Sequence, residues 1–153
     1  MTPFTRRSLL LAAAALPLAS PVRAATLPRA VDLREELAAA LQRKQALVLM
    51  VSLDGCPYCR VVRDHYLAPL HEQQGLPVVQ VDMRSRRHLM DFEGRTIVHD
   101  EFVRARRVQV APTVLFIGPK GEEVAERLAG ASIPDFYGAY LEQRIVQARA
   151  ALR

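Results

Sequence analysis

The sequence predicts a single α/β domain with a central mixed sheet of four strands and helices on both faces. An apolar run at 46–53 and another at 78–82 are separated by a helical pattern, and this order favours a right-handed crossover between parallel strands. Two further strand patterns, at 110–117 and 122–128, are joined by a glycine-containing turn, which predicts an antiparallel hairpin. Helical patterns before, between and after these strands provide the layers that cover such a sheet.

Length and charge are those of an ordinary globular protein. A chain of 153 residues suits one domain, and its formal net charge is +5. Arg6, Arg7 and Arg23 lie in a segment that we expect to be removed, which leaves a charge of about +2. So small a charge does not favour a nucleic-acid partner.

Residues 1–24 have the pattern of a signal peptide, which leaves residues 25–153 as the domain. Arg6 and Arg7 form a basic segment, an apolar run follows at 9–19, and 22–24 places small residues at the positions read by a signal peptidase. We expect cleavage between Ala24 and Ala25 and a periplasmic location.

The apolar run in this segment predicts no permanent membrane anchor, because Pro17 interrupts it and it is shorter than the roughly 20 residues that span a bilayer. The paired arginines resemble a twin-arginine signal, but such pairs also occur in general secretory signals. Both export routes therefore stay open.

The first elements of the domain are a helix at 32–44 and a buried strand at 46–53. Asp32 and Glu35 have the spacing of a capping box, and Leu33, Leu37 and Leu41 repeat at intervals of four residues. The run 46–53 shows no alternation, which is typical of a strand buried on both faces.

The next helix is predicted to start at Tyr58, with an apolar stripe on one face and an end or kink at Pro69. A strand follows at 78–82. The members of the stripe are Cys59, Val62, Tyr66 and Leu70.

The stretch 84–95 predicts no regular element. Its cluster of Arg84, Arg86 and Arg87 is interpreted either as a solvated loop or as a docking site for an acidic partner. We expect a short helix from about Asp100, then the strand at 110–117, a turn at 118–121 and the return strand.

The last helix is predicted at 133–151. Its expected core contacts are Ile133, Phe136, Tyr140, Leu141 and Ile145.

Cys56 and Cys59 are the only cysteines, and they enclose Pro57 and Tyr58 directly after the first apolar run. A helix N-terminus favours a thiolate at Cys56, and Pro57 suits the first helical turn. Cys59, one turn further on, comes back beside Cys56 and can attack a mixed disulfide formed there. We therefore expect Cys56 to be the catalytic nucleophile and Cys59 to be the resolving cysteine.

Two other interpretations of this pair are weaker. A purely structural disulfide would close a loop of two intervening residues and constrain the unfolded chain little. A zinc site would need two more Cys or His ligands at matched spacing, and the chain has no second CxxC motif.

With these motifs the chain resembles the thioredoxin superfamily along nearly all of the predicted domain. The resemblance is carried by Cys56-Pro57-Tyr58-Cys59 and by Ala111-Pro112-Thr113. It implies a thioredoxin-like fold in which Pro112 is cis and lies against the active-site disulfide. It also implies that Ala111 offers backbone groups to an extended substrate segment, and that Pro57 and Tyr58 support the site.

Within the superfamily, the chain is most similar to periplasmic thioredoxin-like reductases associated with sulfur oxidation and disulfide-isomerase systems. The stretches 92–94, 120–121 and 128–130 follow the pattern of that group. The CPYC motif itself is typical of glutaredoxins, but an exported location argues against dependence on glutathione. No cofactor is expected beyond the redox-active disulfide.

The chain departs from thioredoxin at two positions. Met50 stands where thioredoxin has a buried acid that assists proton transfer from the second cysteine, and Gly55 stands in place of a tryptophan. Asp54 and His65 are candidates for that proton transfer. However, Asp54 is also a typical turn residue, and His65 lies about 100° from the centre of the apolar stripe.

The first functional hypothesis is a thiol-disulfide oxidoreductase that reduces exported proteins and is recharged by a thiol-electron donor in the membrane. Reductase and oxidase use the same residues, and a difference of about 30 mV corresponds to only about 1.4 kcal/mol, so the resemblance alone favours reductase. The alternative is a module that holds Cu(I) on Cys56 and Cys59, with His65 or Met50 as a further ligand. A binding module with a vestigial CxxC motif is a third possibility, and it is disfavoured because both thiols are present.

Overall fold

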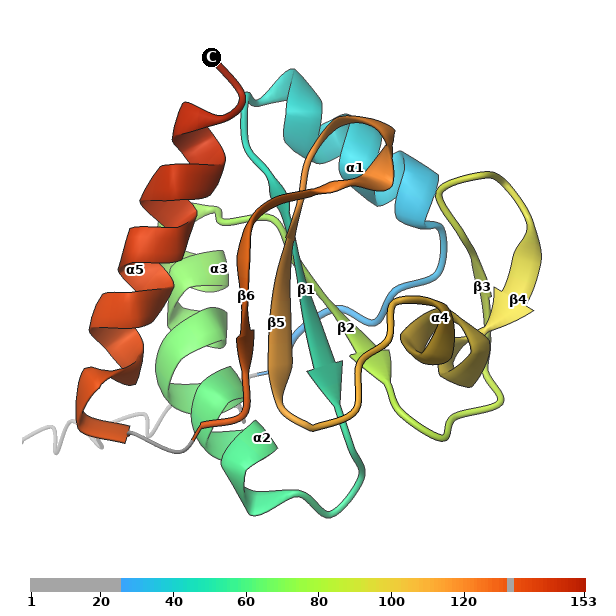
Figure 1. The fold of residues 1–153 in the computed structure, drawn as a ribbon, viewed down its shortest axis with the longest axis horizontal. Coiled ribbons are helices and arrows are strands. Elements are labelled where there is room, and N and C mark those ends of the chain that lie inside the picture. Colours follow the sequence, from blue (N-terminus) through green and yellow to red (C-terminus); the bar gives the residue numbers. More distant parts are fainter. Residues whose placement is uncertain (1–25, 132–133) are drawn as a thin grey trace, which may run out of the picture.

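The computed structural model describes residues 26–131 and 134–153, and it contains the predicted mixed sheet. Four strands lie in the order β2-β1-β5-β6 (Figure 1). β1 (Leu47–Ser52) pairs in parallel with β2 (Val78–Asp82) and antiparallel with β5 (Thr113–Ile117), which pairs antiparallel with β6 (Glu123–Ala129). The expected signal peptide, its cleavage point and Ile133 lie outside the described residues.

β1 lies in the interior of the sheet and is buried along its whole length. Successive side chains of a strand point to opposite faces of the sheet. Val48 and Met50 accordingly enter one core cluster, whereas Leu47, Leu49 and Val51 enter a second cluster on the other face. The predicted two-sided burial of this strand is confirmed.

Helices cover both faces of the sheet, as predicted (Figure 1). The first core cluster is closed by α2 (Pro57–Val62), α3 (Ala68–Gln74) and α5 (Pro134–Ala150). The second is closed by α1 (Leu33–Gln42) and α4 (His99–Ala105). Within the part of the chain described, no helix is long and apolar enough to cross a membrane.

The prediction that the second helix ends at Pro69 is wrong. A π-helical segment, Arg63–Leu67, joins α2 to α3, so the chain stays helical from Pro57 to Gln74. Pro69 lies in the first turn of α3, directly after the wider hydrogen-bond ladder of the π-helix, where its missing N–H is tolerated. Leu67, the last residue of the π-helical segment, and Ala68, the first of α3, are both fully buried.

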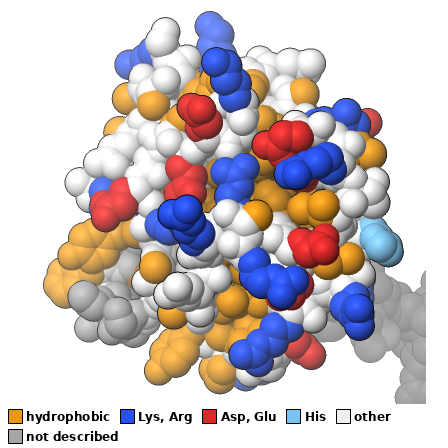
Figure 2. Space-filling view, turned by 45° about the vertical axis from the view of Figure 1, so that its right-hand side comes forward, with side chains coloured by type: hydrophobic (Ala, Val, Ile, Leu, Met, Phe, Trp, Pro, Cys, Tyr) orange, Lys and Arg blue, Asp and Glu red, His pale blue; other side chains and the backbone are white. Residues whose placement is uncertain are grey.

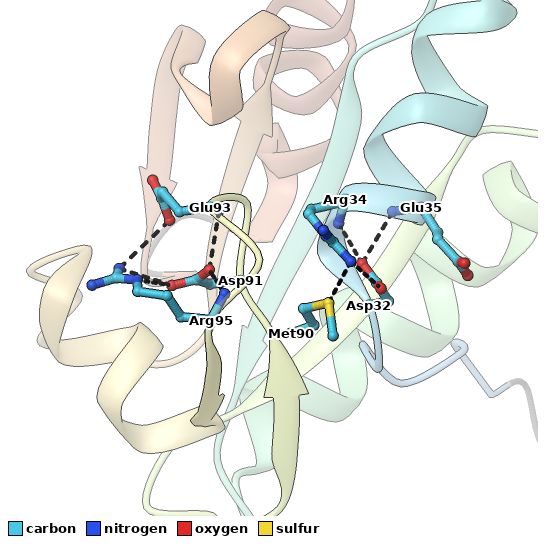
Figure 3. A network of polar contacts seen from close by, with 7 residues as sticks. All are labelled: Asp32, Arg34, Glu35, Met90, Asp91, Glu93 and Arg95. Atoms are coloured by element: carbon cyan, nitrogen blue, oxygen red, sulfur yellow. Dashed lines mark hydrogen bonds and ion pairs between the residues drawn. The ribbon is translucent and has the colours of Figure 1, made fainter.

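A hairpin that the sequence pattern did not predict begins within the stretch 84–95 and ends at Val98. Strands β3 (His88–Met90) and β4 (Thr96–Val98) pair antiparallel in a separate small sheet. Their turn is organised by Asp91, which is 2% exposed and accepts hydrogen bonds from the backbone N–H groups of Glu93 and Arg95 and from the Arg95 side chain (Figure 3).

A carboxylate, rather than an apolar pattern, therefore holds this hairpin together. Burial by itself raises the pKa of Asp91, but the hydrogen bonds from Arg95 and Glu93 and the positive charge of Arg95 lower it below its ordinary value.

The hairpin contacts the start of α1. Asp32 caps this helix as predicted, because its carboxylate accepts from the N–H groups of Arg34 at 2.9 Å and Glu35 at 3.2 Å. The Arg34 guanidinium lies between the Asp32 carboxylate and the sulfur of Met90 (Figure 3). The start of α1 and β3 are thus joined directly.

The predicted core face of the last helix is correct at two positions and wrong at two. Leu141 and Ile145 are buried, whereas Phe136 is 60% exposed and Tyr140 is 45% exposed. Tyr137 is buried instead and contacts Tyr66 in a tilted arrangement, with 5.2 Å between the ring centroids. The buried residues Tyr137, Leu141 and Ile145 thus follow one another at intervals of four residues. Phe136 and Tyr140 each precede a buried residue by one position and therefore face solvent.

Candidate active site

The two cysteines form a disulfide where the loop after β1 enters α2. Cys56 is the N-cap residue of the helix and is half-buried, whereas Cys59 lies one turn further on and is 1% exposed. Their Cα atoms are 5.3 Å apart. The pair thus presents one accessible sulfur and one buried sulfur, which is the asymmetry expected of a nucleophile and a resolving cysteine.

The start of α2 favours negative charge on Cys56. Its Sγ atom accepts a hydrogen bond from the backbone N–H of Cys59 at 3.2 Å. This N–H is one of the donors that a helix leaves unpaired at its N-terminus, and the helix dipole acts in the same direction. In the reduced protein these groups would stabilise a thiolate at Cys56.

The segment before β5 lies beside the disulfide. The carbonyl oxygen of Ala111 is 3.8 Å from Cys56 Sγ, and the Ala111–Pro112 peptide bond is cis. Thr113 Oγ1 donates to the carbonyl of Val110 at 2.8 Å, and the Pro112 carbonyl accepts from the N–H of Gly130 at 2.7 Å. These bonds hold the segment in place, and Ala111 lies where the resemblance puts it.

Pro57 and Tyr58 surround the disulfide from the helix side. Pro57 occupies the first turn of α2, as expected, and both residues are exposed. Tyr58 is 60% exposed, and Val110 also presents an apolar side chain to solvent. The surface next to Cys56 therefore includes exposed apolar groups that a partner could cover.

A cleft of about 870 Å³ opens beside the disulfide and is lined by both Cys56 and Cys59. Its walls are the ends of β1 and β2, the start of α2 and the loop that follows β2. The arginines lining it are Arg29, Arg60, Arg63, Arg84 and Arg87.

The sequence identified Arg84 and Arg87 as part of a basic cluster but did not reveal that these two side chains line the cleft that contains the disulfide, which Arg86 does not line. The sequence could have revealed this, because β1 and β2 were predicted to be parallel and the carboxyl ends of parallel strands meet at one edge of a sheet.

Met50, which stands where thioredoxin has a buried acid, is fully buried and belongs to the same core cluster as Cys59. Of the two substitutes proposed from the sequence, Asp54 lines the cleft together with Cys59, whereas His65 does not. Asp54 is exposed and accepts from the N–H of Gly55 at 3.0 Å, which is a turn contact. His65 is exposed and lines a groove against α5, and it is not among the residues that line the cleft.

Polar groups of β2 also line the cleft. Gln80 and Asp82 continue the face of β2 on which Val78 enters the core cluster of Cys59. The Gln80 amide donates to Asp82 Oδ1 at 2.6 Å, and Asp82 also pairs with Arg29 at 3.3 Å. Asp82 is thus a carboxylate in the same cleft as Cys59 that sequence reasoning did not single out.

His99 is fully enclosed near this end of β2. Its Nδ1 atom accepts from the backbone N–H of Asp82 at 3.0 Å, so Nε2 carries the proton and donates to the Ala30 carbonyl at 3.1 Å. Burial lowers the pKa of His99 below its ordinary value, and the positive charges of Arg87 and Arg29 act in the same direction. The neutral ring therefore joins β2 to the segment before α1.

The described residues include no cluster of three or more His, Cys, Asp or Glu side chains that could hold a metal ion. Of the further copper ligands considered, Met50 is a core side chain and His65 faces the groove against α5.

The comparisons with known proteins agree with this architecture. The family model of the thioredoxin-like domain matches residues 33–145. No curated protein matches the chain. A thioredoxin from Thermus thermophilus is 26% identical, with a TM-score of 0.55, over 84% of this chain and 95% of its own.

Two further solved structures are similar. Mitochondrial thioredoxin 3 from Saccharomyces cerevisiae, in its oxidised form, is 17% identical with a TM-score of 0.50, over 78% of this chain and 93% of its own. The periplasmic thioredoxin SoxS from Paracoccus pantotrophus, in its reduced form, is 27% identical with a TM-score of 0.47, over 68% of this chain and 99% of its own.

Proposed function

The chain belongs to the family of thioredoxin-like domains, and from this premise we propose that it is a thiol-disulfide oxidoreductase that reduces disulfides of exported proteins. The observation that carries the proposal is the Cys56–Cys59 disulfide at the start of α2, with one sulfur accessible and the other buried. Cys56 is the proposed nucleophile and Cys59 the proposed resolving cysteine.

The proposed reaction transfers two electrons and two protons from the dithiol to the substrate. The Cys56 thiolate attacks one sulfur of the substrate disulfide, that S–S bond breaks, and the other substrate sulfur leaves as a thiolate and takes up a proton. Cys59 then loses its proton and attacks Cys56 Sγ, which releases the second substrate thiolate. The products are a substrate dithiol and the Cys56–Cys59 disulfide.

The geometry of the site supports each of these steps. The N–H of Cys59 at 3.2 Å stabilises negative charge on Cys56 Sγ before this sulfur attacks the substrate disulfide. The burial of Cys59 keeps its thiol away from the substrate until the mixed disulfide has formed. The Ala111 carbonyl lies beside Cys56, in reach of an extended substrate backbone.

The location and the electron donor are part of the proposal. The basic and apolar pattern of residues 1–24 supports export, and a periplasmic location removes the glutathione buffer of the cytoplasm. A dithiol that has been oxidised there must be reduced again, and the donor class we propose is a membrane protein that delivers electrons through its own thiol pair.

The proposal is tested by redox titration and turnover of the purified protein. We expect one two-electron couple, and reduction of a disulfide-bonded peptide with dithiothreitol as the electron source. The same assay on Cys56→Ser should show only the uncatalysed rate. Turnover by Cys56→Ser equal to that of the wild type would contradict the proposal, and tight Cu(I) binding by a protein without turnover would favour the metal-handling alternative.

A further inference from the structure

The cleft beside the disulfide is strongly basic. Five arginines and two aspartates line it, whereas the whole chain has 21 basic and 16 acidic side chains. Figure 2 shows Lys and Arg side chains beside exposed hydrophobic side chains at the lower end of the molecule, the end at which the β1–α2 loop lies in Figure 1. The cleft that contains Cys56 therefore has an excess of positive charge.

Two of the five guanidinium groups already have acidic partners. Arg29 pairs with Asp82 at 3.3 Å, and Arg63 pairs with Asp64 at 2.8 Å. Among the described residues, Arg60, Arg84 and Arg87 form no ion pair, and all three are exposed. Three unpaired cations thus lie in the cleft that contains Cys56.

The backbone holds these three residues in position. Arg60 lies one turn after Cys56, and its N–H donates to the Cys56 carbonyl. Arg84 has a φ of 60°, in the left-handed region that favours glycine, and its N–H donates to Asp100 Oδ1 at 3.0 Å.

The loop is anchored a second time at Arg87. The Arg87 carbonyl accepts from the N–H of His99 at 3.0 Å, and its own N–H donates to Ser85 Oγ. Arginine side chains on an anchored loop lose less freedom when they bind a carboxylate than they would on a mobile segment.

We propose that this site reduces disulfides that lie within acidic polypeptide segments, with substrate carboxylates bound by Arg60, Arg84 and Arg87. The inference rests on the proposed reductase function and adds the substrate class. Guanidinium groups bind carboxylates through paired N–H donors, and opposite charges bring the segment to Cys56 faster.

The occupant is a polypeptide rather than a small anion. Pockets for small molecules are mostly apolar, with a few polar groups, whereas this cleft is lined chiefly by charged and polar side chains. The three unpaired arginines come from two separate elements, α2 and the loop after β2. Exposed Tyr58 and Val110 extend the contact surface beyond the cleft.

The test uses three synthetic peptides of equal length, each with one internal disulfide flanked by Glu, Gln or Lys. Turnover is measured with dithiothreitol as the electron source and with the uncatalysed rate subtracted. We expect kcat/KM to fall in the order Glu, Gln, Lys, with about a tenfold range at low ionic strength. Added salt should reduce this range, because exposed ion pairs are screened.

The decisive variant replaces all three arginines, as Arg60→Gln, Arg84→Gln and Arg87→Gln. It should lose the preference among the peptides. The charge-matched control replaces three exposed cations outside the cleft, as Lys120→Gln, Arg149→Gln and Arg153→Gln, and should keep the wild-type preference. Thermal unfolding of both variants shows whether each remains folded.

The outcomes separate the two proposals. If wild-type protein reduces the three peptides equally well, or if the cleft variant keeps the preference, the acidic-substrate inference is wrong and the reductase function stands. If wild-type protein reduces none of them, both proposals are wrong. Faster reduction of oxidised glutathione than of the Glu peptide would overturn the assignment to a polypeptide.

Discussion

Cys56 Sγ accepts a hydrogen bond from the backbone N–H of Cys59, although only the first of these two cysteines is accessible. The residue that supplies the second thiol thus also stabilises charge on the first. A serine at position 59 keeps this N–H and removes only the thiol, so the two functions of Cys59 can be separated by substitution.

The two cysteine variants are predicted to behave differently. Cys59→Ser should form a mixed disulfide with a substrate protein and fail to release it, so that adducts accumulate. Cys56→Ser should form almost none, because the Cys59 thiol is buried. The measurement is non-reducing electrophoresis of each variant after reaction with a disulfide-containing substrate, and equal trapping by both variants would reverse the assignment of the nucleophile.

His99 is predicted to make stability depend on pH. Its pKa is lowered in the folded protein, so the unfolded chain takes up the proton at a higher pH than the folded protein does. The contribution of the neutral ring is full above the unfolded pKa of about 6.5 and is lost progressively as the pH falls below it.

The measurement for His99 is the unfolding midpoint between about pH 5.5 and 7.5, the range around that unfolded pKa. His99→Gln should have a lower midpoint at pH 7.5 and a flatter profile than the wild type. His88→Gln is the matched control, because His88 is exposed, and it should keep the wild-type slope. A wild-type slope in His99→Gln would show that other groups cause the pH dependence.

The corrected core face of α5 gives a paired prediction. Leu141→Ala should lower the free energy of unfolding by about 2–5 kcal/mol, because it leaves a cavity between α5 and the sheet. Tyr140→Ala, on the neighbouring exposed position, should cost about 0.5 kcal/mol or less. Urea unfolding measures both, and a larger loss for Tyr140→Ala than for Leu141→Ala would contradict the observed helix orientation.

The β3–β4 hairpin is predicted to depend on one carboxylate. Asp91→Ala should lower stability by about 1–3 kcal/mol, because it removes the acceptor for the N–H groups of Glu93 and Arg95. Glu93→Ala is the control, since that side chain is exposed and makes only a surface ion pair at 3.5 Å. Hydrogen exchange at Glu93 and Arg95 should accelerate only in the Asp91 variant, and protection retained there would contradict the prediction.

Several features of this protein could be predicted from the sequence because they depend on neighbours along the chain. The uninterrupted apolar run of β1, the Asp32 cap and the position of the CxxC pair at a helix start are all set within a few residues. The order of strands and helices then limits the topology to few arrangements.

Other features were not predicted because they do not produce a regular spacing of apolar residues in the sequence. The β3–β4 hairpin has no apolar alternation to reveal it, since buried Asp91 organises its turn. The π-helical segment before Pro69 changes the turn of the helix, so the stripe drawn on a regular helix missed Leu67 and Ala68.

By itself the sequence determined the Cys56–Cys59 pair at a helix start, because the spacing of two cysteines across one helical turn is a local property. Only the tertiary structure decided what surrounds that pair. Arg60 follows the disulfide along the chain, whereas Arg84 and Arg87 reach the same cleft because parallel strands end at one edge of the sheet. Arg29 reaches it because the segment before α1 pairs with β2 at Gln80. The charge of a cleft depends on which side chains lie close together in the folded protein, and their order along the chain does not determine this.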